Sequence, residues 1–153
     1  MRGIISARIL QEIEEKMNKP ITKLFDLVVG SSTGGLMALG LNKPDSKGRP
    51  LYKARDFVDF YLKNASLIFK KTWWHRFKTG YGLWAPKYDR RFLDATLKEL
   101  LGDTRLSESV GNCLVTSYSI DNERLHFWSS LRARKEFWGD YLMRDVAGAT
   151  SAG

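Results

Sequence analysis

The chain has 153 residues, of which 43% are hydrophobic and 27% charged, and its formal net charge is +8. This length is typical of a single domain with its own core, and the composition is globular rather than disordered. The one cysteine, Cys113, excludes an intramolecular disulfide and a cysteine-cluster metal site. No run reaches the roughly 18 apolar residues of a membrane span, and no secretory signal is visible. We therefore expect a cytoplasmic protein.

Hydrophobic periodicity predicts a helix in the first residues of the chain. Large apolar residues recur there every four positions: Ile5, Ile9, Ile13 and Met17. The pattern ends at Asn18-Lys19-Pro20, because proline cannot continue the helical hydrogen bonds. The next run, Phe25 to Val29, is short and largely apolar, which predicts a strand buried on both faces in a parallel sheet. A buried helix is expected to follow from Leu36 to Leu41.

The rest of the chain predicts helices and a β-hairpin, and no internal repeat or interdomain linker is found. One helix is expected from Ala54 to Ile68, with Phe57, Val58, Tyr61, Leu62 and Ala65 on one face. The later elements are a helix from an Asp89 N-cap to Leu101 with Gly102 as its stop, strands at Cys113–Ile120 and Leu125–Ser129, and a helix from Asp140 to Ala149. This order predicts one α/β domain.

The pattern with chemical content is Gly30-Ser31-Ser32-Thr33-Gly34, which spells G-x-S-x-G. A predicted strand enters it and an apolar helix leaves it. A sharp turn of this kind projects the central Ser32 above a sheet, and the flanking glycines Gly30 and Gly34 relieve crowding. The backbone N–H of Thr33 is then the expected oxyanion donor. The alternatives are a structural glycine-rich turn and a phosphate cradle at the start of the helix.

A nucleophilic serine needs a base. His75 lies in a basic segment where a surface role is commoner. His126 lies within a predicted strand, where a hydrogen-bonded packing role is the more usual one, although it is the one sensible partner for a Ser–His–Asp triad. The other route is a serine–carboxylate dyad without histidine.

The segment from Phe25 to Leu36 resembles the nucleophile segment of patatin-like phospholipases. Met1 to Ile5 resembles the end of that family's D-G-G-G-x-R-G oxyanion motif. Further similar segments are Tyr88-Asp89, the hairpin from Cys113 to Ser129, and Arg144 to Ala152. The resemblance covers essentially the whole chain. It implies a three-layer α/β/α sandwich with a mainly parallel central sheet, and hydrolysis of acyl esters in lipids by a Ser–Asp dyad.

Carried over residue by residue, the resemblance implies that Ser32 is the nucleophile and that Arg2 and Gly3 are the last two positions of the oxyanion motif. The preceding glycines have no counterpart, and the family's D-G-G or D-G-A aspartate lies beyond the matched segments. Asp145 belongs to a different, helical segment and is not assigned that role. Residues 1–153 are thus expected to be a single partial domain, truncated at both ends and nearly inactive. Loss of one oxyanion donor typically costs about 10²–10³ in turnover.

The charge is concentrated in one stretch. From Lys63 to Arg91 there are eight basic residues and one acid, Asp89, so this segment carries +7. It also holds seven of the 19 aromatic residues. The candidates for contact with an anionic membrane surface are Lys70, Lys71, Trp73, Trp74, Arg76, Lys78 and Trp84. The alternatives are tryptophans packed over the sheet beside solvated cations, and nucleic-acid binding, which is the less favoured partner.

The sequence therefore predicts a patatin-like lipid acyl hydrolase that acts on phospholipids or other lipid esters, with peripheral attachment to a membrane. No metal or cofactor is expected. The alternatives are an inactive remnant that binds a lipid or a partner, an acyltransferase, and an esterase with a Ser–His–Asp triad.

Overall fold

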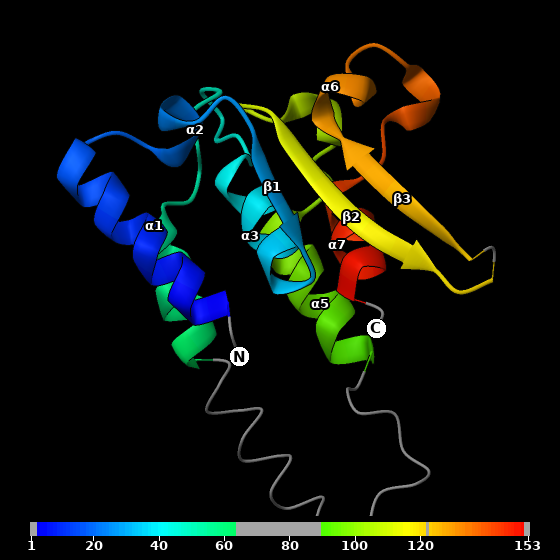
Figure 1. Cartoon of the computed structure of the whole chain (residues 1–153), viewed down its shortest axis with the longest axis horizontal. Coiled ribbons are helices and arrows are strands. Elements are labelled where there is room, and N and C mark those ends of the chain that lie inside the picture. The colour runs from blue at the N-terminus through cyan, green and yellow to red at the C-terminus, as the bar shows by residue number, and fades with distance from the viewer. Residues whose placement is uncertain (1–2, 64–89, 122, 152–153) are drawn as a thin grey trace, which may run out of the picture.

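The computed structural model describes residues 3–63, 90–121 and 123–151 and shows a sheet of three strands (Figure 1). The strands are β1 (Val28–Ser31), β2 (Cys113–Ser119) and β3 (Arg124–Ser129), in that spatial order. β1 runs parallel to β2 with Gly30 opposite Val115, and β3 runs antiparallel to β2 with His126 opposite Ser117. The α/β class predicted from the sequence is confirmed. The described part of the sheet is mixed, with one parallel and one antiparallel pair.

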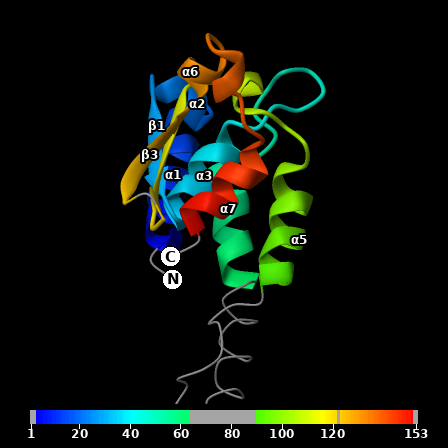
Figure 2. The same cartoon turned by 90° about the vertical axis from the view of Figure 1, so that its right-hand side faces the viewer.

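Helices pack in layers beside this sheet. The longer ones are α1 (Gly3–Met17), α3 (Thr33–Leu41), a helix over residues 54–63, α5 (Arg90–Leu101) and α7 (Met143–Ser151). The short ones are α2 (Ile21–Leu24), η1 (Leu106–Glu108), α6 (Ser130–Ala133) and η2 (Phe137–Gly139). Viewed along the sheet, α3 and α7 lie directly beside it, and α5 lies farther away (Figure 2). In the described part of the chain, no helix is both long and apolar enough to cross a membrane.

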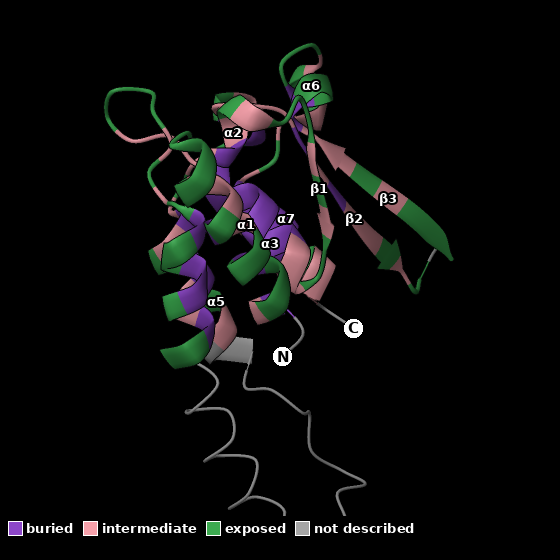
Figure 3. Ribbon diagram, turned by 60° about the vertical axis from the view of Figure 1, so that its left-hand side comes forward, coloured by how far each residue is buried: buried purple, intermediate pink, exposed green. Residues whose placement is uncertain are grey.

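The central helix α3 is buried on all sides, as expected for a helix without a polar face. Leu36 and Leu39 pack into a core with the inner face of the sheet, α5 and α7. Met37 and Leu41 pack into a second core with α1 and the helix over residues 54–63. The purple region of Figure 3 shows this buried centre. Cys113 is also fully buried in the first of these cores, and burial raises the pKa of its thiol.

The prediction that the first strand is buried on both faces is wrong. β1 begins at Val28, three residues later than predicted, and the Val29 side chain is 55% exposed. Successive side chains of a strand point to opposite faces, and the described helices α3, α5 and α7 lie on one side of the sheet (Figure 2). The other face presents Val29 together with three exposed side chains of the hairpin: Tyr118, Leu125 and Phe127.

The first helix is confirmed, but of its predicted apolar stripe only Ile13 packs against the second core, and it is partly buried. Ile5, Ile9 and Met17 are all more than half exposed. The buried positions of α1 are instead small or polar: Gly3, Ala7 and Gln11. Because small side chains let two helices approach closely, α1 reaches α3 through this face. Sequence periodicity identifies an apolar stripe along a helix, but it does not show which face of the helix packs against the rest of the fold.

The remaining elements agree with the sequence in type and differ at their limits. In the helix over residues 54–63, Phe57, Val58 and Tyr61 are buried as predicted, whereas Leu62 is exposed. The predicted Ile68 end, Ala65 and the Asp89 cap lie outside the described residues. α5 ends at Leu101, and Gly102 has a φ of +60°, which confirms it as the helix stop. The hairpin is confirmed, with its first strand ending at Ser119.

The last helix starts at Met143 rather than at Asp140, because Asp140 has other partners. Its carboxylate accepts hydrogen bonds from the backbone N–H and the hydroxyl of Ser107, at 2.9 and 2.8 Å. These contacts hold Asp140 against η1, in the loop before the helix.

Glu14 joins three helices. Its carboxylate oxygens accept the backbone N–H of Ile21 at 2.9 Å and of Ala54 at 2.7 Å, which are the first residues of two helices. An anionic acceptor suits the positive end of a helix dipole. We expect Glu14→Ala to lower the free energy of unfolding by about 1.5–3 kcal/mol, the usual range for hydrogen bonds to charged groups. Urea denaturation followed by circular dichroism measures this. Glu12→Ala, on the exposed side of the same helix, should change stability by less than about 0.5 kcal/mol.

Candidate active site around Ser32

Ser32 occupies the turn between β1 and α3. β1 ends at Ser31, α3 begins at Thr33, and Ser32 itself has φ of +51° and ψ of −124°. A positive φ is unfavourable for a residue with a side chain and persists only where the surroundings hold it in place. The strand, sharp turn and buried helix predicted from the sequence are therefore confirmed as structure.

The two glycines of the motif have different environments. A Cβ atom at Gly30 would lie 2.2 Å from the carbonyl oxygen and 2.3 Å from the carbonyl carbon of Gly34. A Cβ atom at Gly34 would meet nothing within 4 Å. The expectation that both flanking glycines relieve crowding is thus right for Gly30 and wrong for Gly34, whose backbone, not its missing side chain, makes the close approach.

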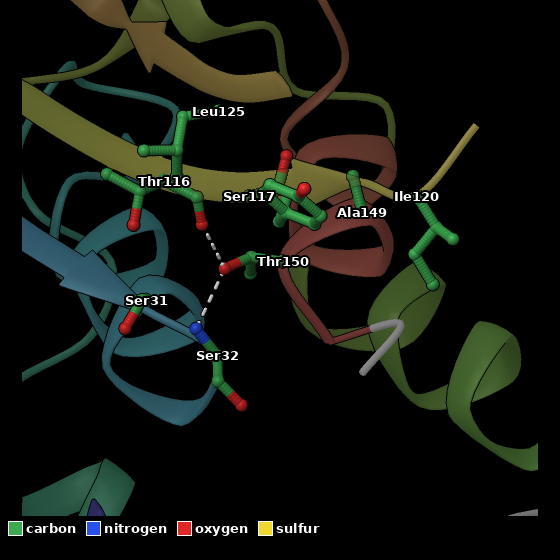
Figure 4. Close-up of a pocket in the computed structure, with 9 residues that line it drawn as sticks. Ser31, Ser32, Thr116, Ser117, Ile120, Leu125, Ala149 and Thr150 are labelled. Atoms are coloured by element: carbon green, nitrogen blue, oxygen red, sulfur yellow. Dashed lines mark hydrogen bonds between the residues drawn. The ribbon is translucent and has the colours of Figure 1, made fainter. Parts of the chain in front are cut away.

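Three hydrogen bonds fix the backbone of the turn. The Ser32 carbonyl accepts the Leu36 N–H at 3.0 Å, which starts the helix. The Ser32 N–H donates to Thr150 Oγ1 at 2.7 Å (Figure 4). The Tyr61 hydroxyl donates to the Thr33 carbonyl at 2.7 Å, and burial raises the pKa of Tyr61, so this donor stays protonated. The turn is anchored to α3, α7 and the helix over residues 54–63 at once.

These hydrogen bonds determine which backbone N–H groups of the turn are free to bind an oxyanion. The Ser32 N–H is already used by Thr150, so it cannot also stabilise an oxyanion. The first amides of a helix have no acceptor within the helix, and Thr33 is the first residue of α3. The Thr33 N–H therefore has no acceptor within α3, and its role as the oxyanion donor stays a prediction.

The beginning of the chain comes close to this turn. A Cβ atom at Gly3 would lie 3.0 Å from both Cβ and Oγ1 of Thr33. The first residue of α1 thus packs against the residue that follows the serine, which brings together two of the segments singled out in the sequence. Arg2 lies outside the described residues, so its part in an oxyanion site stays a prediction.

No base is in place for Ser32 within residues 3–63, 90–121 and 123–151. No imidazole or carboxylate there is hydrogen-bonded to the Ser32 hydroxyl. His126 stacks on Trp128 with ring centroids 5.6 Å apart, which fits the packing role rather than the triad role. The Asp145 side chain is exposed, and its Oδ1 lies 3.7 Å from Arg144 Nε in an ion pair. His75 lies outside the described residues.

A pocket of about 330 Å³ opens beside the serine. It lies between the turn, the end of the hairpin and α7, and its polar end is formed by hydroxyl groups around Ser32 (Figure 4). Apolar side chains line the end nearer the hairpin. The lining residues are Ser31, Ser32, Thr116, Ser117, Tyr118, Ile120, Leu125, Ala149 and Thr150. Among the described residues, no group of three histidine, cysteine, aspartate or glutamate side chains could hold a metal ion.

Sequence reasoning missed two contributors to the site, Thr150 and Tyr61. Thr150 stands 118 positions after Ser32, within the segment from Arg144 to Ala152 that resembles the patatin-like family, and nothing else in the sequence marks it. Tyr61 was predicted as a core residue, and its hydroxyl contact with Thr33 has no sequence signal. Neither contact could be inferred from spacing, because both depend on how distant helices pack.

Comparison with known proteins decides the family. The sequence model of the patatin-like phospholipases matches residues 1–153. The chain belongs to this family. It is 34% identical over 159 residues to patatin-like protein 4 of Arabidopsis thaliana, and 34% identical over 161 residues to patatin-like protein 2 of Oryza sativa subsp. indica. It is 28% identical over 159 residues to a Solanum tuberosum protein named probable inactive patatin-3-Kuras 1.

Each of these alignments covers 99% of this chain, while the chain spans 40%, 40% and 41% of the three relatives, respectively. The resemblance seen in the sequence is thus confirmed for the family. Membrane contact by the segment from Lys63 to Arg91 stays a prediction, because all its candidate residues lie outside the described part of the chain: Lys70, Lys71, Trp73, Trp74, Arg76, Lys78 and Trp84.

Proposed function

We propose that this patatin-like chain carries the nucleophile of a lipid acyl hydrolase, and that the nucleophile is Ser32. The observation that carries the proposal is the conformation of Ser32, held at a φ of +51° between a strand and a buried helix in a member of this family. Energetically unfavourable backbone angles persist where the surrounding structure over-determines them, and they cluster at active sites. The substrate class is a phospholipid or another lipid ester, as the family description suggests.

In the proposed reaction, Ser32 Oγ attacks the carbonyl carbon of a fatty-acyl ester. The serine proton passes to a base, the carbonyl electrons move onto the oxygen, and the Thr33 N–H stabilises that charge. Collapse of the intermediate breaks the ester C–O bond, and the leaving alcohol takes the proton. Water then loses a proton to the base and attacks the acyl carbonyl carbon, the bond from that carbon to Ser32 Oγ breaks, Oγ takes the proton back, and the fatty acid leaves. If another alcohol replaces water, the same intermediate gives acyl transfer.

We further propose that the 153-residue chain turns over slowly by itself. The family resemblance implies an aspartate as the base of a Ser–Asp dyad, and in the described part of the chain no carboxylate contacts Ser32. Removal of a serine's base typically costs on the order of 10⁴ or more in turnover. A reactive phosphonate requires one bond-forming event per molecule, so it can still report the nucleophile.

The test is labelling with a fluorophosphonate, followed by mass spectrometry to locate the adduct. Wild type should be labelled slowly and stoichiometrically at Ser32, and Ser32→Ala should not be labelled. Ser31→Ala is the matched control, since it removes the neighbouring hydroxyl of the same motif, and it should still be labelled. Hydrolysis of a p-nitrophenyl acyl ester should stay near the uncatalysed rate.

Other results favour other functions. A folded wild-type chain without any adduct would support an inactive remnant that binds lipid or a partner. The Solanum tuberosum relative carries the name probable inactive patatin-3-Kuras 1. Rapid ester hydrolysis that disappears in Ser32→Ala would contradict slow turnover. If His126→Ala then removed the same activity, a Ser–His–Asp esterase would replace the dyad.

Contact with an anionic membrane surface completes the proposal. It is supported by the net charge of +7 between Lys63 and Arg91 and by the three tryptophans of that segment. An acyl hydrolase whose substrate lies in a bilayer gains from being held against it.

A further inference from the structure

Thr150 connects three elements through a single hydroxyl group. Its Oγ1 donates to the Thr116 carbonyl of β2 at 2.6 Å and accepts the N–H of Ser32 at 2.7 Å (Figure 4). A hydroxyl has one proton and two lone pairs. Because the proton is directed to Thr116, a lone pair is left facing the Ser32 amide. The direction of both hydrogen bonds is thus determined by the strand.

The threonine methyl group fixes the orientation of this hydroxyl. A Cβ atom at Gly35 would lie 3.0 Å from Thr150 Cγ2, so the methyl sits directly over the Gly35 backbone of α3. β-Branched side chains have restricted χ1 angles, and this packing favours one of them. Gly35 therefore makes room for Thr150, and Thr150 in turn reaches the amide of the strained residue next to α3.

The Ser32 amide is an effective place to hold this turn. The N–H belongs to the residue with the positive φ, and its direction changes directly with that angle. Figure 4 shows the Ser32 side chain pointing away from Thr150, so the contact leaves the serine hydroxyl unobstructed. A bond to the amide can thus control where Oγ lies without occupying Oγ.

We propose that Thr150 is a positioning residue for Ser32: its hydroxyl, oriented by the Thr116 carbonyl, holds the Ser32 amide and with it the strained turn that aims the nucleophile. This inference rests on the proposed function of Ser32. It assigns Thr150 no contact with substrate. A displacement of a reacting group by about 1 Å can cost roughly 10²-fold in rate, which sets the expected size of the effect.

The test compares two substitutions at position 150 in the 153-residue chain. Thr150→Val keeps the shape and the methyl over Gly35 but removes the hydroxyl. Thr150→Ser keeps the hydroxyl and removes the methyl. Thr22→Val is the matched control, because the Thr22 hydroxyl is buried and has no hydrogen-bond partner among the described residues. The same isosteric change there removes no contact.

Fluorophosphonate labelling is measured over a range of reagent concentrations. We expect Thr150→Val to lower the maximal labelling rate by about 10- to 100-fold with little change in the half-saturating concentration, because the attacking atom is displaced and the pocket is kept. Thr150→Ser should restore most of the rate, and Thr22→Val should match wild type. A wild-type rate in Thr150→Val, or an equal loss in Thr150→Ser, would overturn the proposal.

Amide hydrogen exchange of Ser32, followed by NMR, provides a readout that does not need a reactive serine. The Ser32 N–H should exchange faster in Thr150→Val than in wild type and Thr150→Ser, while amides of the α3 core remain protected. If wild type is folded but unlabelled, the proposed function fails, and the exchange result still decides whether Thr150 holds the turn. Equal exchange in wild type and Thr150→Val would refute that contact.

Discussion

Replacement of Gly30 by alanine should lower the free energy of unfolding by more than about 3 kcal/mol and abolish labelling of Ser32. The added methyl would lie 2.2 Å from the Gly34 carbonyl oxygen and 2.6 Å from the Gly35 nitrogen. Both are backbone atoms in the first turn of α3, so they cannot move aside as a flexible side chain would. Overpacking typically costs about 1–3 kcal/mol and more where the neighbours are rigid.

The matched control lies in the same motif. Gly34→Ala adds a methyl in open space at a helical position, so it should fold normally. Alanine is favoured over glycine there by roughly 0.5–1 kcal/mol, and a small gain in stability is expected. Urea denaturation followed by circular dichroism gives both values. If Gly30→Ala unfolds at the wild-type urea concentration, the close approach between the end of β1 and the start of α3 is not present in solution.

The local part of the site was predictable from the sequence because it is encoded within a few residues. A strand, two glycines around a serine and an apolar helix are contiguous, so their order determines the sharp turn at Ser32. The stop at Gly102 was predictable for the same reason, since a glycine readily takes the positive φ that ends α5. Both features depend on neighbouring backbone rather than on distant packing.

The faces of the elements were not predictable in this way. Ile5 and Val29 are apolar residues in correctly predicted elements, yet both are more than half exposed. Whether an apolar side chain is covered depends on which element packs against it, and periodicity within one segment does not contain that information. The contact of Thr150 with Ser32 is of the same kind, because it exists only when α7 lies beside α3.

Phe57 links the core to the site, and Phe57→Ala should be among the most destabilising core substitutions, at about 3–5 kcal/mol. The Phe57 side chain is 1% exposed, and the centroids of the Phe57 and Tyr61 rings are 6.3 Å apart. The Tyr61 hydroxyl in turn donates a hydrogen bond to the Thr33 carbonyl. Loss of the ring leaves a cavity next to Tyr61 and should also slow the labelling of Ser32. Leu62→Ala, on the exposed side of the same helix, should change stability by less than about 0.5 kcal/mol.

A double-mutant cycle shows whether this packing is as close as the structure has it. A Cβ atom at Gly40 would lie 2.2 Å from Phe57 Cζ, so Gly40→Ala should cost about 1–3 kcal/mol by overpacking. Phe57→Leu shortens the side chain at that point and makes room for the new methyl. The double variant should therefore be more stable than the sum of the two single changes predicts, by at least about 0.5 kcal/mol. Strict additivity would mean that the Phe57 ring does not rest on Gly40, and that the helix over residues 54–63 holds Tyr61 against the turn by other contacts.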